Sequence, residues 1–389
     1  MEETEAQRLQ IISELWFEDG NLLIQAENTQ YRVFRGILAA RSSVFEDMQS
    51  LPQPPASEQA ENCAFLLLPD PAPEVTVFLK AIFDADFFKP YPAPAEFNEV
   101  IGCLRLGHKY GVDFLWRRAL VHLSSGYATT LSRLDAMIES EFGEESTSRP
   151  SESVLEARSW TAPLQPAHQI RAIQVAREVG ALWILPRAFY ILCSDFPALH
   201  RAVFMGTDYE GIPMSLSEHD REVFIKGREI QSGSSADILQ FLSHPLNTVG
   251  CQQAGLCILT RLKAIGNISR RQGFRSYSTL PLHIWRWRAH INLLDDMCTT
   301  CILALKKTHQ AARQEFWDKL PEMYGLPNWN ELERLKIESI GAVVHQVSPR
   351  ALYRGHDEPV IRLSGLLVWA IQLSQNVYSQ CCKKLREKK

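Results

Sequence analysis

The residues best suited to chemistry are two cysteines in the sequence Cys-Thr-Thr-Cys, at positions 298 and 301. Two thiolates at this spacing can bind one tetrahedral zinc ion, but a closed structural site needs two further ligands. The candidates are Cys251 and Cys257, or His283, His290 and His309. None repeats the CxxC spacing, and free cysteines are usually small buried hydrophobic residues. The sequence therefore favours Cys298 and Cys301 as buried side chains on a helix, with no bound metal or other cofactor.

Sequence motifs of common enzymes are absent. The chain contains no GxxxxGK[ST], GxGxxG, HExxH or GxSxG pattern. Its 45 acidic residues include no pair that is set apart for acid–base catalysis. We therefore expect a protein that is not an enzyme and has no catalytic residues.

Aromatic and basic residues alternate in the run HIWRWR at positions 283–288. Such a run can stack nucleic-acid bases. It also fits a helix whose tryptophans pack inward while the arginine stems lie over the surface. The formal net charge of −4 gives no global attraction for nucleic acid or anionic membranes, so the packed helix is favoured. A zinc-stabilised regulatory protein that contacts nucleic acid through its C-terminal half is an alternative.

The elements that would position these residues begin with an α+β N-terminal part. Leu9, Ile12, Leu15 and Trp16 occur at helical spacing, which predicts an amphipathic helix over 4–16. A hairpin and one further strand are predicted at 22–26, 29–34 and 64–68. Helices are predicted at 36–40, 43–48, from 73 onward, at 97–108 and at 112–123. Either Ser42 or Ser43 can cap the helix that runs through Met48.

The remainder of the chain is predicted to be mainly α-helical. A polar stretch at 143–166 has the composition of a linker or a disordered insertion. We expect an N-terminal domain over 1–125, a helical extension over 126–142, this linker over 143–166, and an α-helical region over 167–389. The helices expected in that region are 169–193, 217–231, 236–242, 252–268, 281–318, 330–346 and 359–385.

The order of elements in the N-terminal part resembles the BTB/POZ domain family over residues 15–123. The sequences that carry the resemblance are DGNLLIQAENTQYRVFRGILAARSSVFEDM and LRLGHKYGVDFLWRRALVHL. Phe34 stands where many members have histidine, which removes a polar group from the start of the helix. The rest of the chain, with AREVGALWILPRAFYILC and WDKLPEMYGLPNWNELE, is similar to fungal BTB proteins that carry a long helical C-terminal region.

The resemblance implies a non-catalytic protein–protein interaction module that forms homodimers or recruits a partner protein. The self-association face that it implies comprises Leu9, Ile12, Leu15, Trp16, Ile37, Leu38, Val44 and Phe45. For Ile37 and Leu38, packing in the core is the favoured explanation, because a helix in the middle of a small domain buries its apolar side in any case. The opening segment has no evident partner in its own unit, so we expect a second chain to cover its apolar side.

A charged pair is implied at the floor of the dimer groove, between Asp19 and Arg35. Two charges taken partly out of water are tolerated only together, because leaving one unpaired costs about 3–5 kcal/mol. An alternative function is a substrate adaptor for a cullin-type ubiquitin ligase. Relatives that dock a cullin scaffold use a hydrophobic-any-Glu pattern, to which Ala72-Pro73-Glu74 is the nearest approach.

Nine cysteines scattered over 389 residues indicate reduced thiols rather than a disulfide framework. No stretch has the layout of a secretory signal. The apolar run LSGLLVWAIQL is shorter than the ~20 residues that a membrane helix needs. We therefore expect a protein of the cytoplasm or nucleus that binds other proteins and no membrane.

Overall fold

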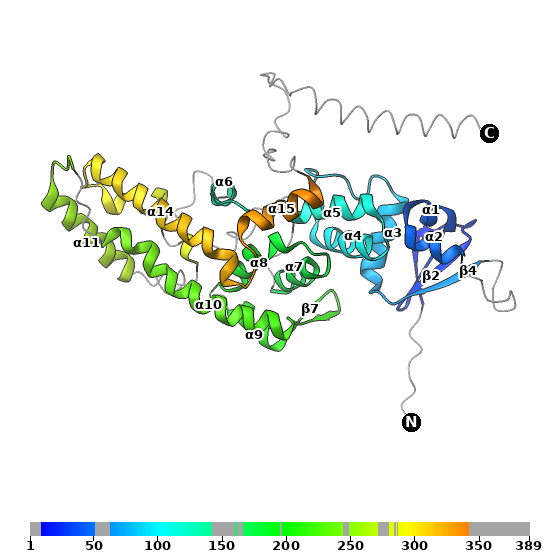
Figure 1. Ribbon diagram of the computed structural model, residues 1–389. Helices are drawn as coiled ribbons and strands as arrows, with labels where there is room; N and C mark the ends of the chain where they lie inside the picture. Colours follow the sequence, from blue (N-terminus) through cyan, green and yellow to red (C-terminus); the bar gives the residue numbers. More distant parts are fainter. Residues whose placement is uncertain are drawn as a thin grey trace, which may run out of the picture. The chain divides into compact units, whose positions relative to one another are not determined.

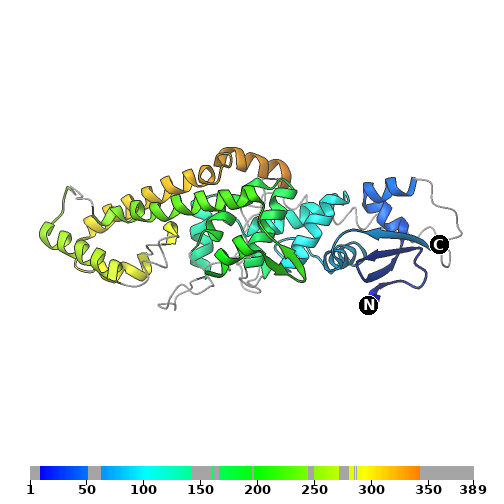
Figure 2. The same cartoon turned by 90° about the horizontal axis from the view of Figure 1, so that it is seen from below.

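A small mixed sheet occupies the N-terminal part of the chain, and the part that follows is mostly helical (Figures 1 and 2). The computed structural model describes residues 9–50, 63–141, 160–161, 166–194, 197–243, 249–270, 280–283, 285 and 287–341. The predicted fold class is confirmed at this level, an α+β part followed by helices.

The N-terminal sheet has four strands in the order β1-β3-β2-β4. They are β1 Gln10–Trp16, β2 Leu22–Ala26, β3 Thr29–Val33 and β4 Ala64–Leu68. β2 and β3 form the predicted antiparallel hairpin, while β1 runs parallel to β3 and β4 parallel to β2. Buried and half-buried residues alternate along β2 and β3, as expected for strands with one face on a core. The strands predicted at 22–26, 29–34 and 64–68 are confirmed.

The amphipathic helix predicted over 4–16 is wrong where the structure describes it, because Gln10–Trp16 is strand β1. The register of β1 against β3 is irregular between Ile11 and Trp16. A bulge of this kind lets Ile12 and Leu15 both pack against the core although they lie three residues apart. Apolar residues three positions apart also indicate a helix, which is why the sequence of this bulged strand predicted one.

The described residues of the N-terminal part, up to 125, also include five helices. They are α1 Arg35–Arg41, α2 Ser43–Ser50, α3 Ala72–Phe83, α4 Phe97–Lys109 and α5 Asp113–Ser125. The predicted helices at these positions are confirmed. Ser42, and not Ser43, caps α2: its Oγ accepts a hydrogen bond of 3.0 Å from the backbone NH of Phe45. One side of α3 is buried through Val75, Phe78 and Leu79, as its apolar spacing predicted.

The segment between the two parts contains α6 Leu131–Glu141, which lies in the predicted helical extension. Most of the predicted linker over 143–166 lies outside the described residues. Within it, β6 Trp160–Thr161 pairs in parallel with β5 Ala95–Glu96.

The helical region differs in detail from the predicted helices. Its elements are α7 Pro166–Glu178, η4 Leu182–Ile184, α8 Leu185–Leu192, α9 Pro197–Met205, β7 Thr207–Tyr209, β8 Ile212–Met214, α10 Glu218–Leu239, η5 Gln240–Leu242, α11 Ala254–Arg270, η6 Pro281–His283, α13 Trp287–His290, η7 Ile291–Leu294, α14 Thr299–Met323 and α15 Trp329–Ile340. Helices α10 and α14 lie side by side (Figures 1 and 2).

Two long predicted helices are wrong. The helix over 169–193 is interrupted at Gly180, whose φ of +71° is left-handed backbone. The helix over 281–318 is instead three short turns followed by α14. Conversely, the predicted helices at 217–231 and 236–242 are largely one element, α10. The helix predicted at 359–385 lies outside the described residues.

The buried core continues from the N-terminal domain into the helical region, from Leu15 to Leu332. Arg171 of α7 forms an ion pair with Glu74 of α3, and Lys336 of α15 donates a hydrogen bond of 3.2 Å to Thr129. The described part of the chain includes no helix that is both long and apolar enough to cross a membrane.

Candidate functional site

The first candidate is the predicted self-association face, and part of it is core. Leu15, Leu38 and Phe45 are 1%, 0% and 3% exposed. Ile12 and Val44 are partly buried against the same core. These side chains pack within their own chain, so they offer little surface to a second molecule.

The rest of the predicted face is accessible. Leu9 and Ile37 are 52% and 41% exposed, and Trp16 is half-buried. Asp19 lies in an exposed turn and Arg35 is half-buried, with its backbone NH donating a 2.9 Å hydrogen bond to Asn21 Oδ1. The pairing of Asp19 with Arg35 stays a prediction.

Sequence reasoning missed the face of the sheet that points away from the core, here called the outer sheet face. Register places its residues in two rows across the strands: Ile11, Gln30, Gln25 and Leu67 in one, and Trp16, Arg32, Leu23 and Phe65 in the other. Ile11, Phe65 and Leu67 are 54%, 56% and 61% exposed. Three large apolar side chains that are exposed on two edge strands are unusual for a monomeric protein in water.

The interior of the outer sheet face is polar but nearly uncharged. Gln30 donates a 3.0 Å hydrogen bond from its side chain to that of Gln25. Arg32 is the one charged residue of the two rows, and its Nε donates to the Gly20 carbonyl at 2.9 Å. The sequence of β4, AFLLL, could not reveal this face. All five residues are apolar, so no alternation of polar and apolar residues shows which side chains point outward.

The Ala72-Pro73-Glu74 pattern does not present a docking surface. Ala72 is 8% exposed and Glu74 is 5% exposed. The Glu74 carboxylate accepts hydrogen bonds from Arg105, at 2.6 Å, and from Arg171. These residues therefore give no support to the cullin-adaptor alternative.

Glu74 belongs to a buried ionic network that connects α3, α4 and α7. Its centre is Asp70, which is 1% exposed and accepts hydrogen bonds from Arg105 at 3.0 Å, Lys109 at 2.7 and 2.8 Å, and Tyr110 Oη at 2.5 Å. Burial acts to raise the pKa of Asp70, but the hydrogen bonds of Lys109 and Tyr110 and the charge of Arg105 outweigh it and lower the pKa. We interpret this network as structural, since its charges neutralise one another.

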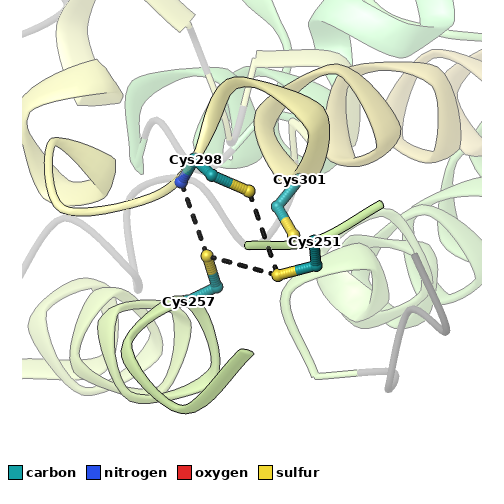
Figure 3. Close-up of side chains that lie close together, drawn as sticks. All are labelled: Cys251, Cys257, Cys298 and Cys301. Carbon is teal, nitrogen blue, oxygen red and sulfur yellow. Dashed lines mark hydrogen bonds between the residues drawn. The ribbon is translucent and has the colours of Figure 1, made fainter. Parts of the chain in front are cut away.

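The second candidate is a cluster of four cysteines in the helical region. Cys251, Cys257, Cys298 and Cys301 lie together, with all four sulfur atoms within 4.8 Å of one another (Figure 3). The prediction of two buried hydrophobic cysteines on one helix thus describes only part of the arrangement. Cys301 is buried in the first turn of α14, but Cys298 is half-buried and stands at the N-cap.

The environment of Cys298 favours its thiolate. Hydrogen bonding from the Cys301 backbone NH is the main cause that lowers the pKa of Cys298, to about 6, and the backbone of Gln252 acts in the same direction. Burial raises the pKa of the Cys257 thiol. The three histidines considered as ligands have other contacts: His283 hydrogen-bonds Tyr190, and His309 accepts from Trp287 Nε1 at 3.2 Å. The ring of His290 stacks on that of Trp285 at 4.9 Å.

The tryptophans of the aromatic–basic run at 283–288 pack inside the protein and are not displayed on its surface. Trp285 is 2% exposed and its ring lies 5.3 Å from that of Phe241. Trp287 is half-buried and packs against the core. The prediction that the tryptophans pack inward is confirmed, although Trp285 lies just outside helix α13. These rings provide no stacking platform for nucleic-acid bases.

A cavity of about 330 Å³ lies between the end of α5, the following loop, the start of α6 and α15. Its lining comprises Ser124, Ser125, Tyr127, Ala128, Thr129, Thr130, Ser132, Arg133, Glu333 and Lys336. Burial lowers the pKa of Lys336 to about 8, which makes the amine more available as a base. The lining contains no histidine or cysteine to act with it, so we assign no reaction to this cavity.

Comparison with known proteins identified no relative. No protein-family model matches the chain, and neither does any curated protein or solved structure.

Proposed function

We propose that this chain is a non-catalytic protein–protein interaction protein that forms homodimers through its N-terminal domain. The observation that carries the proposal is the outer sheet face, with Ile11, Phe65 and Leu67 each more than half exposed on edge strands. The resemblance of residues 15–123 to BTB/POZ domains points to the same function. Recruitment of a different partner protein by this face is the alternative outcome.

A second copy of the chain is the occupant that fits this surface. The two rows present apolar side chains at the edges, an amide pair in the middle and a single charge on Arg32. A nearly uncharged face meets its own copy without like-charge repulsion, as an interface about a two-fold axis requires. Leu9, 52% exposed just before β1, extends the apolar surface at one edge.

The test is the mass of the full-length chain in solution, measured by sedimentation equilibrium at micromolar concentration. We expect a dimer. Ile11→Asp should raise its Kd by at least tenfold, because both copies would then bury an unpaired carboxylate in the interface. Phe65→Asp should act in the same way.

A matched control is Ile225→Asp on α10, since Ile225 is 52% exposed and Ile11 is 54% exposed. This control should sediment as the wild type does. A monomeric wild-type chain would remove the homodimer, and a dimer that is indifferent to both Ile11→Asp and Phe65→Asp would move the interface elsewhere.

A further inference from the structure

We propose that Cys251, Cys257, Cys298 and Cys301 bind one zinc ion in a closed tetrahedral site that fastens the start of α11 to the start of α14. The cysteines come from two places in the chain: Cys251 and Cys257 flank the beginning of α11, and Cys298 and Cys301 flank the beginning of α14. Figure 3 shows the four side chains converging between these elements.

The sulfur separations fit a single metal ion. Cys251 Sγ lies 3.9 Å from Cys257 Sγ and 3.9 Å from Cys298 Sγ, and no pair among the four exceeds 4.8 Å. Four sulfurs at the usual Zn–S distance of about 2.3 Å in a tetrahedron are about 3.8 Å apart. A disulfide would need about 2.05 Å, and a cluster of several iron atoms would hold its thiolates further apart. The geometry therefore matches one tetrahedral ion.

Backbone amides are already directed at the sulfurs. The Cys298 NH donates to Cys257 Sγ at 3.4 Å, and the NH groups of Cys301 and Gln252 donate to the Cys298 sulfur. Such bonds orient thiolate ligands and offset their negative charge, as outer-shell partners do in metal sites. With all four ligands supplied by protein, the site has no open position, which is the pattern of a structural and not a catalytic zinc.

The packing of α11 shows why a metal is needed there. Its buried side consists of small or polar residues, Cys257, Thr260, Arg261 and Ala264, all at most 7% exposed. Four of its large apolar residues, Leu256, Ile258, Leu259 and Leu262, are 43–55% exposed, and Ile265 is partly buried against the core. These four side chains therefore bury only part of their apolar surface, and a helix in a protein takes most of its stability from tertiary packing of such a face. Zinc bound to Cys251 and Cys257 would supply additional support, because metal-binding free energy is also folding free energy.

The test is metal analysis of the full-length chain after removal of any affinity tag and exhaustive dialysis against buffer without metal. We expect one zinc per chain, and tetrahedral absorption with thiolate charge-transfer bands when cobalt(II) replaces it. Cys298→Ser should lose the metal. Cys63→Ser is the matched control, because Cys63 is half-buried in the N-terminal domain and outside the cluster; it should retain the metal.

Because Cys298→Ser could fail to fold, a second variant keeps the test decisive. Cys251→His replaces one ligand by another that zinc accepts, so it should retain the metal that Cys251→Ser loses. A folded wild-type chain that holds no metal, and in which all four cysteines of the cluster are reduced thiols, would overturn the proposal. So would a disulfide within the cluster, bound iron in place of zinc, or zinc that Cys298→Ser still holds. None of these outcomes affects the homodimer proposal, whose residues lie in the N-terminal sheet.

Discussion

The N-terminal sheet and the cysteine-bearing ends of α11 and α14 are held together by different means. On β2 and β3 the buried positions are apolar side chains such as Ile24, Tyr31 and Val33, all at 0% exposure. On α11 the fully buried positions are small or polar, most of the described large apolar residues are exposed, and Ile265 is only partly buried. Hydrophobic patterning therefore specifies the N-terminal sheet. The starts of α11 and α14 depend instead on four cysteine ligands that come together only when the chain folds.

The largest effect that separates the two regions should follow removal of zinc. Chelation, or Cys257→Ser, should remove hydrogen-exchange protection from the amides of α11 and the first turn of α14. Structural zinc sites contribute on the order of 10 kcal/mol of folding free energy. Without the metal, α11 and the first turn of α14 should therefore be locally unfolded most of the time. Exchange mass spectrometry should show β2 and β3 unchanged.

Two results would break this contrast between the regions. Protection of α11 that survives chelation would show that packing alone is sufficient. Loss of protection throughout the chain would show that the two regions unfold as one. Cys63→Ser, treated in the same way, controls for the change of a thiol in itself.

The next largest effect concerns the ionic network of the N-terminal domain. Asp70→Asn should destabilise the chain by about 2–3 kcal/mol, because it removes the buried carboxylate that pairs with Lys109 and leaves Arg105 with only the Glu74 and Glu178 carboxylates. Urea denaturation measures the change. Since the pKa of Asp70 is lowered on folding, this contribution is present above the ordinary carboxyl pKa of about 3.9 and is lost as the pH falls through the folded value.

Glu14→Gln provides the comparison for Asp70→Asn. Glu14 pairs with Lys80 at 3.1 Å, but its side chain is 65% exposed. Its loss should cost much less than that of Asp70, because solvent screens an exposed ion pair. Equal effects of the two substitutions would mean that burial does not govern the strength of these pairs.

A smaller and pH-dependent effect is expected from His309 in the helical region. Burial, reinforced by the charge of Arg313, lowers the pKa of His309 to about 3. The unfolded chain therefore binds a proton near pH 6.5 that the folded chain does not, so stability falls as the pH drops below that value. By linkage this residue alone should cost about 2 kcal/mol between about pH 7 and pH 5.

His309→Gln should remove that part of the acid sensitivity, as measured by denaturation at several pH values. Glutamine retains a hydrogen-bond acceptor for Trp287 but does not titrate. His219→Gln, at an exposed position, controls for the exchange of histidine for glutamine in itself. An unaltered slope in His309→Gln would show that another group causes the acid sensitivity.

The same division explains what could be predicted from the sequence. Strand β3 and helices α3, α4 and α5 are predictable because their apolar spacing is local and regular, and β2 and β4 are predictable as short, mainly apolar runs. Strand β1 was missed because its bulge gives Ile12 and Leu15 helical spacing. The cysteine cluster was considered and set aside, because spacing in the chain does not show that positions 251 and 301 meet. In the structure each cysteine pair brackets the start of a helix, but the single helix expected over 281–318 concealed the start of α14.

The smallest expected effects come from two glycines, one in each region, whose responses to alanine should have opposite signs. Gly36 lies in α1, and an added Cβ would meet no atom within 4 Å. Gly36→Ala should stabilise the chain by about 0.5–1 kcal/mol, because it lowers the entropy of the unfolded state. Gly250 precedes the ligand Cys251 and has a φ of +90°, a left-handed conformation that side chains rarely adopt.

The cost at Gly250 is therefore one of backbone conformation and not of crowding, since the nearest atom to an added Cβ is Thr300 Cγ2 at 3.9 Å. Gly250→Ala should cost about 1–2 kcal/mol, and because that strain acts where Cys251 meets the metal, zinc affinity should fall by about tenfold. Competition with a chromophoric chelator measures the affinity. A loss of stability at unchanged zinc affinity would place the strain in the loop and not in the metal site.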